Sequence, residues 1–384
     1  MRGATDRVVR DSMPFLNGDE LARGRAGMAR EWLLAVDLGT TWTRAAYTTP
    51  DGTAPVVVRV PVTQLAWFPT AVARSSDGRW LVGDAAVSRR IGRPDWYWSD
   101  VKRDLGRDEP RLLGGHPFAA VEAATQPVLH AARLARRQAG RGFDRLVLSA
   151  PVCFSADQRA ALREAGENAG FAPDAVTIVD EAAAAARAAL GPRPEDGTWV
   201  VVDIGGGTFD AALVSADRGV AHVLDQVGDD TAGGRALDAA IVARLRERYQ
   251  IEDADGEARR RRALYLRDAA RMLREELSEA RTADVFLPDL LLELTLTPAQ
   301  LRDLVEPALA PAVESCSAML ARNDLSWEKV NALVLAGGAT RGPTVRAQFA
   351  PLAPLRDAAA PELAVVLGLT VPAEASNRTI LSLH

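Results

Sequence analysis

The chain has 384 residues, of which 48% are hydrophobic and 25% are charged, proportions that are ordinary for a folded globular protein and argue against a disordered chain. Its 46 basic and 51 acidic residues give a net charge of −5 without a long block of like charges, so neither nucleic acid nor a membrane is expected as a partner. The two cysteines and four histidines show no metal-ligand spacing, and no apolar run is long enough to span a bilayer, which favours a cytoplasmic location.

Strand-like and helix-like segments alternate along the first half of the chain, which is typical of an α/β protein. A short polar residue at the start of a helical stretch, such as Ser155, can cap the first turn of that helix. In chain order we expect a polar extension over residues 1–30, strands over 33–37, 43–47 and 56–60, a helix over 120–140, a strand over 146–149 and a helix from Ser155.

The second half of the chain repeats this pattern after a Gly/Pro-rich break at residues 191–194. The tripeptides that begin at Asp37 and Asp203 are alike and lie 166 residues apart (203 − 37), and the same shift carries Ala45 onto Ala211. This repeat predicts two duplicated lobes. The expected elements are strands over 199–202, 209–214 and 220–226, a charged helical region over 235–280, a hairpin over 284–296, a strand over 332–336 and a helix that begins near Pro343.

The first of three glycine-containing turns spans residues 37–41 and is a candidate phosphate site. Gly39 permits close approach of the backbone, while Thr40 and Thr41 offer hydroxyl and N–H groups to phosphate oxygens. Asp37 ends the preceding strand and is a candidate ligand for magnesium, mostly through water. An ordinary β-turn is the alternative interpretation.

The second and third turns complete a nucleotide-binding pattern. Residues 203–210 contain three consecutive glycines, Gly205, Gly206 and Gly207, between apolar strands, so no side chain separates the backbone amides from a ligand. Residues 335–341 place Gly337 and Gly338 where a base and a ribose can lie against the backbone, with Arg341 able to stack or pair. The dinucleotide fingerprint and the P-loop are both absent from the sequence.

In this order and spacing, the three turns resemble those of the nucleotide-binding domain of the DnaK-type heat-shock protein 70 (Hsp70) chaperones, in the actin and sugar-kinase superfamily. Residues 82–86, 100–107 and 151–159 also resemble segments of that family. The resemblance covers most of residues 31–372. It implies a two-lobed actin-like ATPase fold of the α/β class, with duplicated RNase H-like domains and a nucleotide cleft between them.

The resemblance also implies a domain organisation. Lobe I would cover residues 31–191, with a shortened peripheral subdomain at about 62–140, and lobe II would cover residues 192–360, with a helical subdomain at about 233–300. Residues 361–384 would return to lobe I. The chain ends 16 residues after Gly368 (384 − 368), so we expect no peptide-binding domain of the kind that full-length chaperones carry.

Residue roles follow from the same resemblance. Lys102, one of only two lysines in the chain, would contact the γ-phosphate and position the attacking water, and Thr208 would approach the same phosphate. Glu181 and Asp203 would share the magnesium waters with Asp37. An exposed surface lysine and an exposed glutamate at a helix start are the alternative interpretations of Lys102 and Glu181. Further nucleotide contacts are implied for Gly233, Gly234, Arg274, Ser278 and Glu362, although Arg274 is also typical of a solvated helix face.

The sequence departs from the family pattern at three sites, which comprise four residues. Ala182–Ala183 stands where relatives usually carry Pro-Thr, Ala339 stands in place of a serine, and Glu275 stands in place of an arginine expected to stack on adenine. The family's Pro-Thr is associated with relaying the nucleotide state, and the other two positions with binding adenine. These departures therefore bear on coupling and on base affinity.

The sequence thus predicts a protein that binds ATP and ADP with Mg²⁺ and hydrolyses ATP slowly. It would act as a nucleotide-driven conformational switch that an unidentified protein partner detects. The alternatives are a nucleotide sensor that no longer hydrolyses ATP, an actin-like filament subunit and, with the weakest support, a sugar kinase. The helical region over 235–280 argues against the filament subunit.

Overall fold

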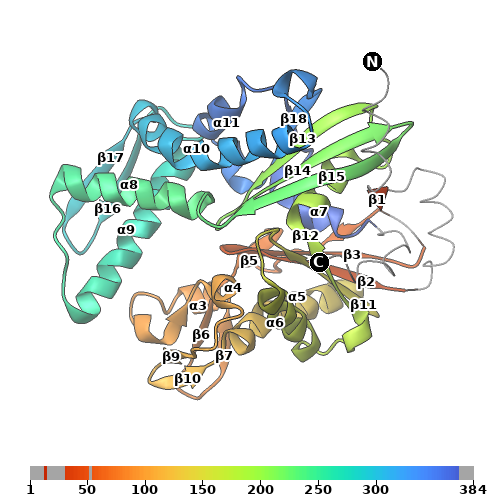
Figure 1. The fold of residues 1–384 in the computed structure, drawn as a ribbon. Coiled ribbons are helices and arrows are strands. Elements are labelled where there is room, and N and C mark those ends of the chain that lie inside the picture. The colour runs from red at the N-terminus through yellow and green to blue at the C-terminus, as the bar shows by residue number, and fades with distance from the viewer. Residues whose placement is uncertain (1–12, 15–30, 52–53, 372–384) are drawn as a thin grey trace.

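The structure is a computed structural model that describes residues 13–14, 31–51 and 54–371 (Figure 1). The predicted extension over residues 1–30, apart from residues 13–14, and the last part of the predicted C-terminal segment lie outside this description. Two six-stranded sheets dominate the fold (Figure 1). Strands of the first half of the chain form one sheet, and strands of the second half form the other together with residues 13–14. None of the described helices is both long and apolar enough to cross a lipid bilayer.

The sheet of the first half, which we call the lobe I sheet, has the strand order β12-β11-β2-β3-β4, and β5 also pairs with β3. Strands β2, β3 and β4 form an antiparallel meander, and β11 and β12 add to β2 in parallel. The strands are β2 (Leu33–Leu38), β3 (Trp42–Thr48), β4 (Val56–Val57), β5 (Trp67–Pro69), β11 (Arg145–Ala150) and β12 (Val176–Asp180). The predicted meander is therefore confirmed, although its third strand is shorter than expected.

The sheet of the second half, the lobe II sheet, has the order β1-β15-β14-β13-β18-β19. It repeats the same plan, with an antiparallel meander of three strands followed by two parallel strands. The strands are β1 (Met13–Pro14), β13 (Gly197–Ile204), β14 (Phe209–Asp217), β15 (Val220–Asp229), β18 (Ala332–Ala336) and β19 (Leu355–Asp357). The sequence did not predict β19, because it spans only three residues.

The register of the two central hairpins is the same. Asp37 pairs with Arg44 across β2 and β3, and Asp203 pairs with Asp210 across β13 and β14. The shift of 166 residues that relates the two aspartates also relates their partners (44 + 166 = 210). The internal repeat seen in the sequence is thus a repeat of strand pairing. The residue boundaries predicted for the lobes and their subdomains stay predictions.

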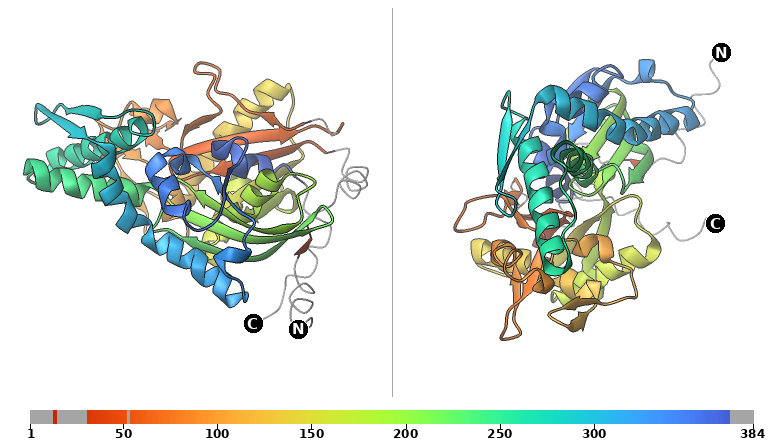
Figure 2. Two further views of the ribbon diagram at one scale, coloured as in Figure 1. Left: turned by 90° about the horizontal axis from the view of Figure 1, so that it is seen from above. Right: turned by 90° about the vertical axis from the view of Figure 1, so that its left-hand side faces the viewer.

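Helices cover the outer faces of both sheets and fill the space between them (Figures 1 and 2). Helices α5 (Ala120–Ala139) and α6 (Ala156–Asn168) pack on the lobe I sheet, and α10 (Pro298–Arg322) and α11 (Pro343–Phe349) pack in lobe II. The first turn of α6 is capped by Ser155, whose hydroxyl accepts a hydrogen bond from the Gln158 amide, as predicted.

Helices α7 (Glu181–Leu190) and α12 (Ala364–Gly368) lie between the two sheets. The small side chains of α7 share one buried cluster with Ala35 and Ala46 of the lobe I sheet, Val201 and Ala212 of the lobe II sheet and Val366 of α12. Small residues on all sides let the backbones approach closely. The chain therefore returns to the junction of the lobes near its end, as far as residue 371.

Smaller units extend from each lobe beside the main sheets. In lobe I these are the three strands β6 (Val72–Arg74), β7 (Trp80–Val82) and β8 (Tyr97–Trp98), the hairpin β9 (Arg111–Leu113) and β10 (His116–Phe118), and the short helices α3 (Asp84–Val87) and α4 (Val101–Asp104). In lobe II they are α8 (Gly234–Tyr249), α9 (Gly256–Glu276) and the hairpin β16 (Ala283–Leu287) and β17 (Leu292–Leu296). The 3₁₀ turns are η2 (Pro94–Trp96), η3 (Pro173–Ala175), η4 (Trp327–Lys329), η5 (Gly338–Arg341) and η6 (Pro361–Leu363).

The aromatic residues 96–98 are packed in this structure and do not form an exposed surface. Trp98 is 1% exposed and its indole N–H donates to Asp104 at 2.8 Å. Tyr97 is also buried, and Trp96 is half-buried. These side chains therefore contribute to the packing of the smaller units of lobe I.

We expect Gly368→Ala to lower the free energy of unfolding by about 1–3 kcal/mol, because overpacking in a close-packed junction carries a cost of that size. A Cβ at this position would collide with the carbonyl oxygen of Ala184 in α7. Thermal melting measures the effect. Gly92→Ala is the control, because a Cβ at Gly92 would have no atom within 4 Å. A melting temperature that falls equally in both variants would contradict the docking role of α12.

Candidate nucleotide-binding site

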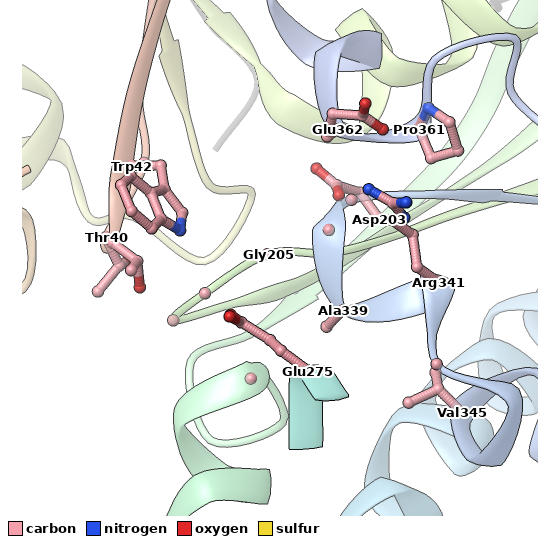
Figure 3. A pocket seen from close by; sticks show the side chains of 18 of the residues that line it. Thr40, Trp42, Asp203, Gly205, Glu275, Ala339, Arg341, Val345, Pro361 and Glu362 are labelled. Atoms are coloured by element: carbon pink, nitrogen blue, oxygen red, sulfur yellow. The ribbon is translucent and has the colours of Figure 1, made fainter. Parts of the chain in front are cut away.

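A cleft of about 370 Å³ lies between the two lobes, and residues from both lobes line it. Figure 3 shows Thr40 and Trp42 of lobe I on one side, across from Glu275, Ala339 and Arg341 of lobe II. The predicted site residues that line the cleft are Asp37, Gly39, Thr40, Thr41, Lys102, Glu181, Asp203, Gly205, Gly206, Gly207, Thr208, Gly234, Arg274, Ser278, Gly337, Gly338, Arg341 and Glu362.

Gly233 is the predicted site residue that does not line this cleft. A Cβ at Gly233 would collide with the carbonyl carbon of Gly207 and would lie 2.5 Å from the amide nitrogen of Thr208. Gly233 therefore lies behind the triple-glycine turn and lets α8 begin directly against it. Its expected contact with nucleotide stays a prediction, and the packing indicates a supporting position.

The first and second glycine turns, which belong to different lobes, meet at the bottom of the cleft. A Cβ at Gly206 would collide with the Thr41 hydroxyl, and a Cβ at Gly207 would collide with the Thr40 hydroxyl. Only glycine leaves room for this approach. The backbone of residues 206–207 and the two threonine hydroxyls are consequently close together. Amide and hydroxyl donors at one place are suited to an anion.

Lys102 and Glu181 form a buried ion pair beside these turns. Lys102, on α4, is 2% exposed, and its Nζ donates to Oε1 of Glu181 at 2.5 Å. Burial alone would lower the pKa of Lys102, but the negative charges of Glu181 and Asp37 outweigh it and raise the pKa. The ammonium is therefore held charged. The exposed alternatives considered for Lys102 and Glu181 are wrong.

Asp37 and Asp203 are the penultimate residues of the equivalent strands β2 and β13, and both are buried. Ser149 Oγ donates to Oδ1 of Asp37 at 2.9 Å, and Nη1 of Arg44 donates to Oδ2 at 3.2 Å. Within the part of the chain that the structure describes, Asp203 has no comparable hydrogen-bond or ion-pair partner. Burial, together with the charges of Glu181 and Asp37, raises the pKa of Asp203 to about 8.

These carboxylates fit a hydrated magnesium ion better than a bare one. Within the described residues, no three Asp, Glu, His or Cys side chains are grouped so that they could hold a metal ion directly. Asp37, Glu181 and Asp203 nevertheless line the same cleft, and the repulsion between them leaves negative charge that a cation would relieve. Magnesium keeps several of its waters when bound, so contact through water, as predicted, is compatible with this arrangement.

Sequence reasoning missed two charged residues at this end of the cleft. Arg44 lines the cleft beside Asp37, and Asp210 is buried beneath it, where the amide of Val152 donates to its Oδ1 at 2.7 Å. Burial and the nearby charge of Glu181 raise the pKa of Asp210 well above its ordinary value. The signal was present in the repeat, since Arg44 and Asp210 are the cross-strand partners of the two predicted aspartates.

The opposite end of the cleft is built from α9 and η5. Nε of Arg274 donates to Oδ1 of Asp238 at 2.7 Å, and the Arg274 side chain is only 13% exposed, so it is not a solvated helix face. Ser278 donates to the carbonyl oxygen of Glu275 at 2.5 Å. The Glu275 carboxylate is exposed and extends toward the cleft (Figure 3). A stacking arginine is therefore absent at position 275, as the sequence indicated.

Two equivalent sheets with a cleft at their junction define the two-lobed actin-like ATPase fold, which confirms the predicted fold class. A protein-family model described as Hsp70 protein matches residues 112–374, and the chain belongs to the Hsp70 family. It is 31% identical over 357 residues to the chaperone protein DnaK of Halobacterium salinarum, an alignment that covers 90% of this chain and 56% of that protein.

Two further DnaK proteins are similar to the chain over comparable lengths. The chain is 30% identical to the chaperone protein DnaK of Methanothermobacter thermautotrophicus over 334 residues, which cover 83% of this chain and 55% of that protein. It is 30% identical to the chaperone protein DnaK of Thermosipho melanesiensis over 331 residues, which cover 83% and 54%. The chain thus spans somewhat more than half the length of the curated relatives it matches.

Proposed function

We propose that the chain binds ATP and ADP with Mg²⁺ in the cleft between its lobes, hydrolyses ATP slowly and acts as a nucleotide-driven switch. The observation that carries this proposal is the convergence of three glycine turns from two lobes on one cleft, beside the buried ion pair of Lys102 and Glu181. Family membership supports ATP as the nucleotide. Location in the cytoplasm stays a prediction from the sequence.

In this proposal the chain contributes positioning and charge more than covalent chemistry. The amides of Gly206 and Gly207 and the hydroxyl of Thr208 donate to phosphate oxygens, while the Gly205 amide donates to the carbonyl oxygen of Thr208 at 2.9 Å. Lys102 donates to the γ-phosphate and orients the attacking water, and Glu181 holds the Lys102 ammonium in place through the ion pair at 2.5 Å. Magnesium, when bound through water to Asp37, Glu181 and Asp203, supplies neutralisation of phosphate charge.

The switch in this proposal is the junction of the lobes. A nucleotide that contacts the turns of both lobes favours their closed arrangement, and ATP differs from ADP by the phosphate that Lys102 and Thr208 would contact. Helices α7 and α12 lie in the buried cluster that joins the sheets, so a change in lobe angle would displace them. An unidentified protein partner would detect that displacement.

Phosphate release and nucleotide binding, measured on the same samples, test the proposal. We expect slow Mg²⁺-dependent release of phosphate from ATP, inhibited by ADP. Trp42 and Trp67 line the cleft, so their fluorescence should change when either nucleotide binds. A protein that binds neither nucleotide would contradict the proposal and leave the fold unaffected.

A nucleotide sensor without hydrolysis is the second candidate function. The exposed Glu275 carboxylate in the cleft and the alanines at 182, 183 and 339 favour it, because these positions depart from the family pattern. Tight ATP binding with no phosphate release would select this candidate over the ATPase. Light scattering with ATP separates both from a filament subunit, since only filaments would raise the signal.

A further inference from the structure

Arg44 brings a second cation to the phosphate end of the cleft. It lies on β3, between buried neighbours, and is the cross-strand partner of Asp37. Its side chain lines the cleft and is only 13% exposed. A guanidinium stays charged at all ordinary pH values, so this burial places a permanent positive charge there.

The hydrogen bonds of Arg44 are incomplete. Nη1 donates to Oδ2 of Asp37 at 3.2 Å and to the carbonyl oxygen of Trp42 at 3.4 Å. Nε is buried and has no hydrogen-bond partner among the described residues. Leaving a charged donor buried and unpaired costs free energy, so such a group calls for an acceptor that a ligand would bring.

The position of Arg44 indicates what that acceptor is. Its Nη1 lies 3.6 Å from where a Cβ of Gly39 would be, so the guanidinium is beneath the first glycine turn. In lobe II the equivalent position is Asp210, a carboxylate, so the repeat has placed opposite charges at the two equivalent positions. The Arg44 guanidinium lies beside Asp37, so it offsets the repulsion between the Asp37 carboxylate and a phosphate.

We propose that Arg44 is a phosphate-binding and positioning residue, which fixes the Asp37 carboxylate and donates its remaining N–H groups to a nucleotide phosphate. This inference rests on the proposed function. Because Arg44 offsets the charge of Asp37 and also binds phosphate, part of the nucleotide affinity does not depend on Mg²⁺. The chain therefore retains measurable binding of ADP and ATP when Mg²⁺ is removed.

Calorimetric titration of ADP and ATP, each in Mg²⁺ and in EDTA, tests this inference. For each protein the quantity compared is the Kd in EDTA divided by the Kd in Mg²⁺. Because bound Mg²⁺ would itself offset the charges of Asp37 and the phosphate, the loss of Arg44 weakens nucleotide binding more in EDTA than in Mg²⁺. We therefore expect Arg44→Met to increase this ratio about 10- to 100-fold over wild type, a change bounded by the full effect of one charge-assisted hydrogen bond. Arg44→Lys should give an intermediate ratio, because one ammonium cannot satisfy Asp37 and phosphate with the same geometry.

Arg271→Met is the matched comparison, because Arg271 lines the same cleft near Trp42 but makes no contact with Asp37. An equal rise of the ratio in Arg271→Met and Arg44→Met, or an unchanged ratio in Arg44→Met, would overturn the inference while leaving the proposed function in place. If Arg44→Met does not fold, the ratio of Arg44→Lys decides in the same way. Wild type that binds no nucleotide even in Mg²⁺ would overturn both.

Discussion

Lys102→Ala is expected to reduce the rate of phosphate release by about a hundred- to a thousandfold while nucleotide binding persists. Removing one preorganised group that stabilises developing charge costs an enzyme roughly this factor. Lys102 is suited to that role because it is 2% exposed, held by Glu181 at 2.5 Å and kept charged by Glu181 and Asp37. Single-turnover phosphate release and ADP titration of the same preparation provide the two measurements.

The other lysine of the chain provides a matched control. Lys329 ends the turn η4, is exposed and does not line the cleft, so Lys329→Ala should release phosphate at the wild-type rate. Lys102→Ala leaves the buried Glu181 without its cation, a change that typically costs about 3–5 kcal/mol of stability. The double variant Lys102→Met/Glu181→Gln removes both charges and should fold better, with the same loss of turnover. Phosphate release within a few-fold of wild type in that double variant would remove Lys102 from the proposed mechanism.

The main strands and turns of both lobes were predictable because their signals are local. Buried strands such as 33–38 and 197–204 are short apolar runs, and each ends at a glycine turn. The triple glycine is explained by the close approach of the backbone of the two turns, which leaves no room for a Cβ. Without that need, three glycines would only add conformational entropy to be lost on folding. The duplication was detectable because the tripeptides that begin at Asp37 and Asp203 are alike in sequence and have the same register.

Long-range pairing could not be read from local patterns. Strand β19 has three residues and forms only because β18 offers it a parallel edge. The two-residue strand β8 likewise depends on a partner that is distant in sequence, since Trp98 pairs with Val72 of β6. Arg44 is a single charged residue in an apolar strand, and sequence alone does not show whether it points to solvent or to Asp37. The packing of Gly233 behind the triple-glycine turn was likewise not predictable, since only the folded structure distinguishes the front of a turn from its back.

Asp203→Asn should raise the melting temperature of the nucleotide-free protein while abolishing Mg²⁺-dependent hydrolysis. Asp203 is 5% exposed, and its burial next to Glu181 and Asp37 raises its pKa from 3.8 to about 8. The wild-type fold therefore carries the cost of keeping an acid in a site that disfavours its charged form. Asparagine keeps the shape of the side chain and removes that cost. Asp203, the proposed ligand of the magnesium waters, would thus stabilise the magnesium-bound protein and destabilise the magnesium-free protein.

The stability difference between Asp203→Asn and wild type should depend on pH, because Asp203 takes up its proton at different pH values in the folded and the unfolded chain. Below about pH 4 Asp203 is protonated in both the folded and the unfolded chain, so it has no effect on stability. As the pH rises from there to about 8, the unfolded chain loses the proton and the folded chain keeps it, so the wild type loses up to about 1.4 kcal/mol per pH unit. The advantage of Asp203→Asn should therefore grow between pH 5 and pH 8 and then level off.

Thermal melts in EDTA at pH 5, 6.5 and 8 measure this difference without interference from magnesium. Asp217→Asn is the control, because Asp217 ends β14 on the surface with its side chain 75% exposed, and its melting temperature should follow the wild type at every pH. An Asp203→Asn protein no more stable than wild type at pH 8 would mean that Arg44 and Lys102 already compensate the charge of Asp203. The carboxylates of the cleft would then need no added cation to be stable together, and the electrostatic argument for magnesium at this site would fail.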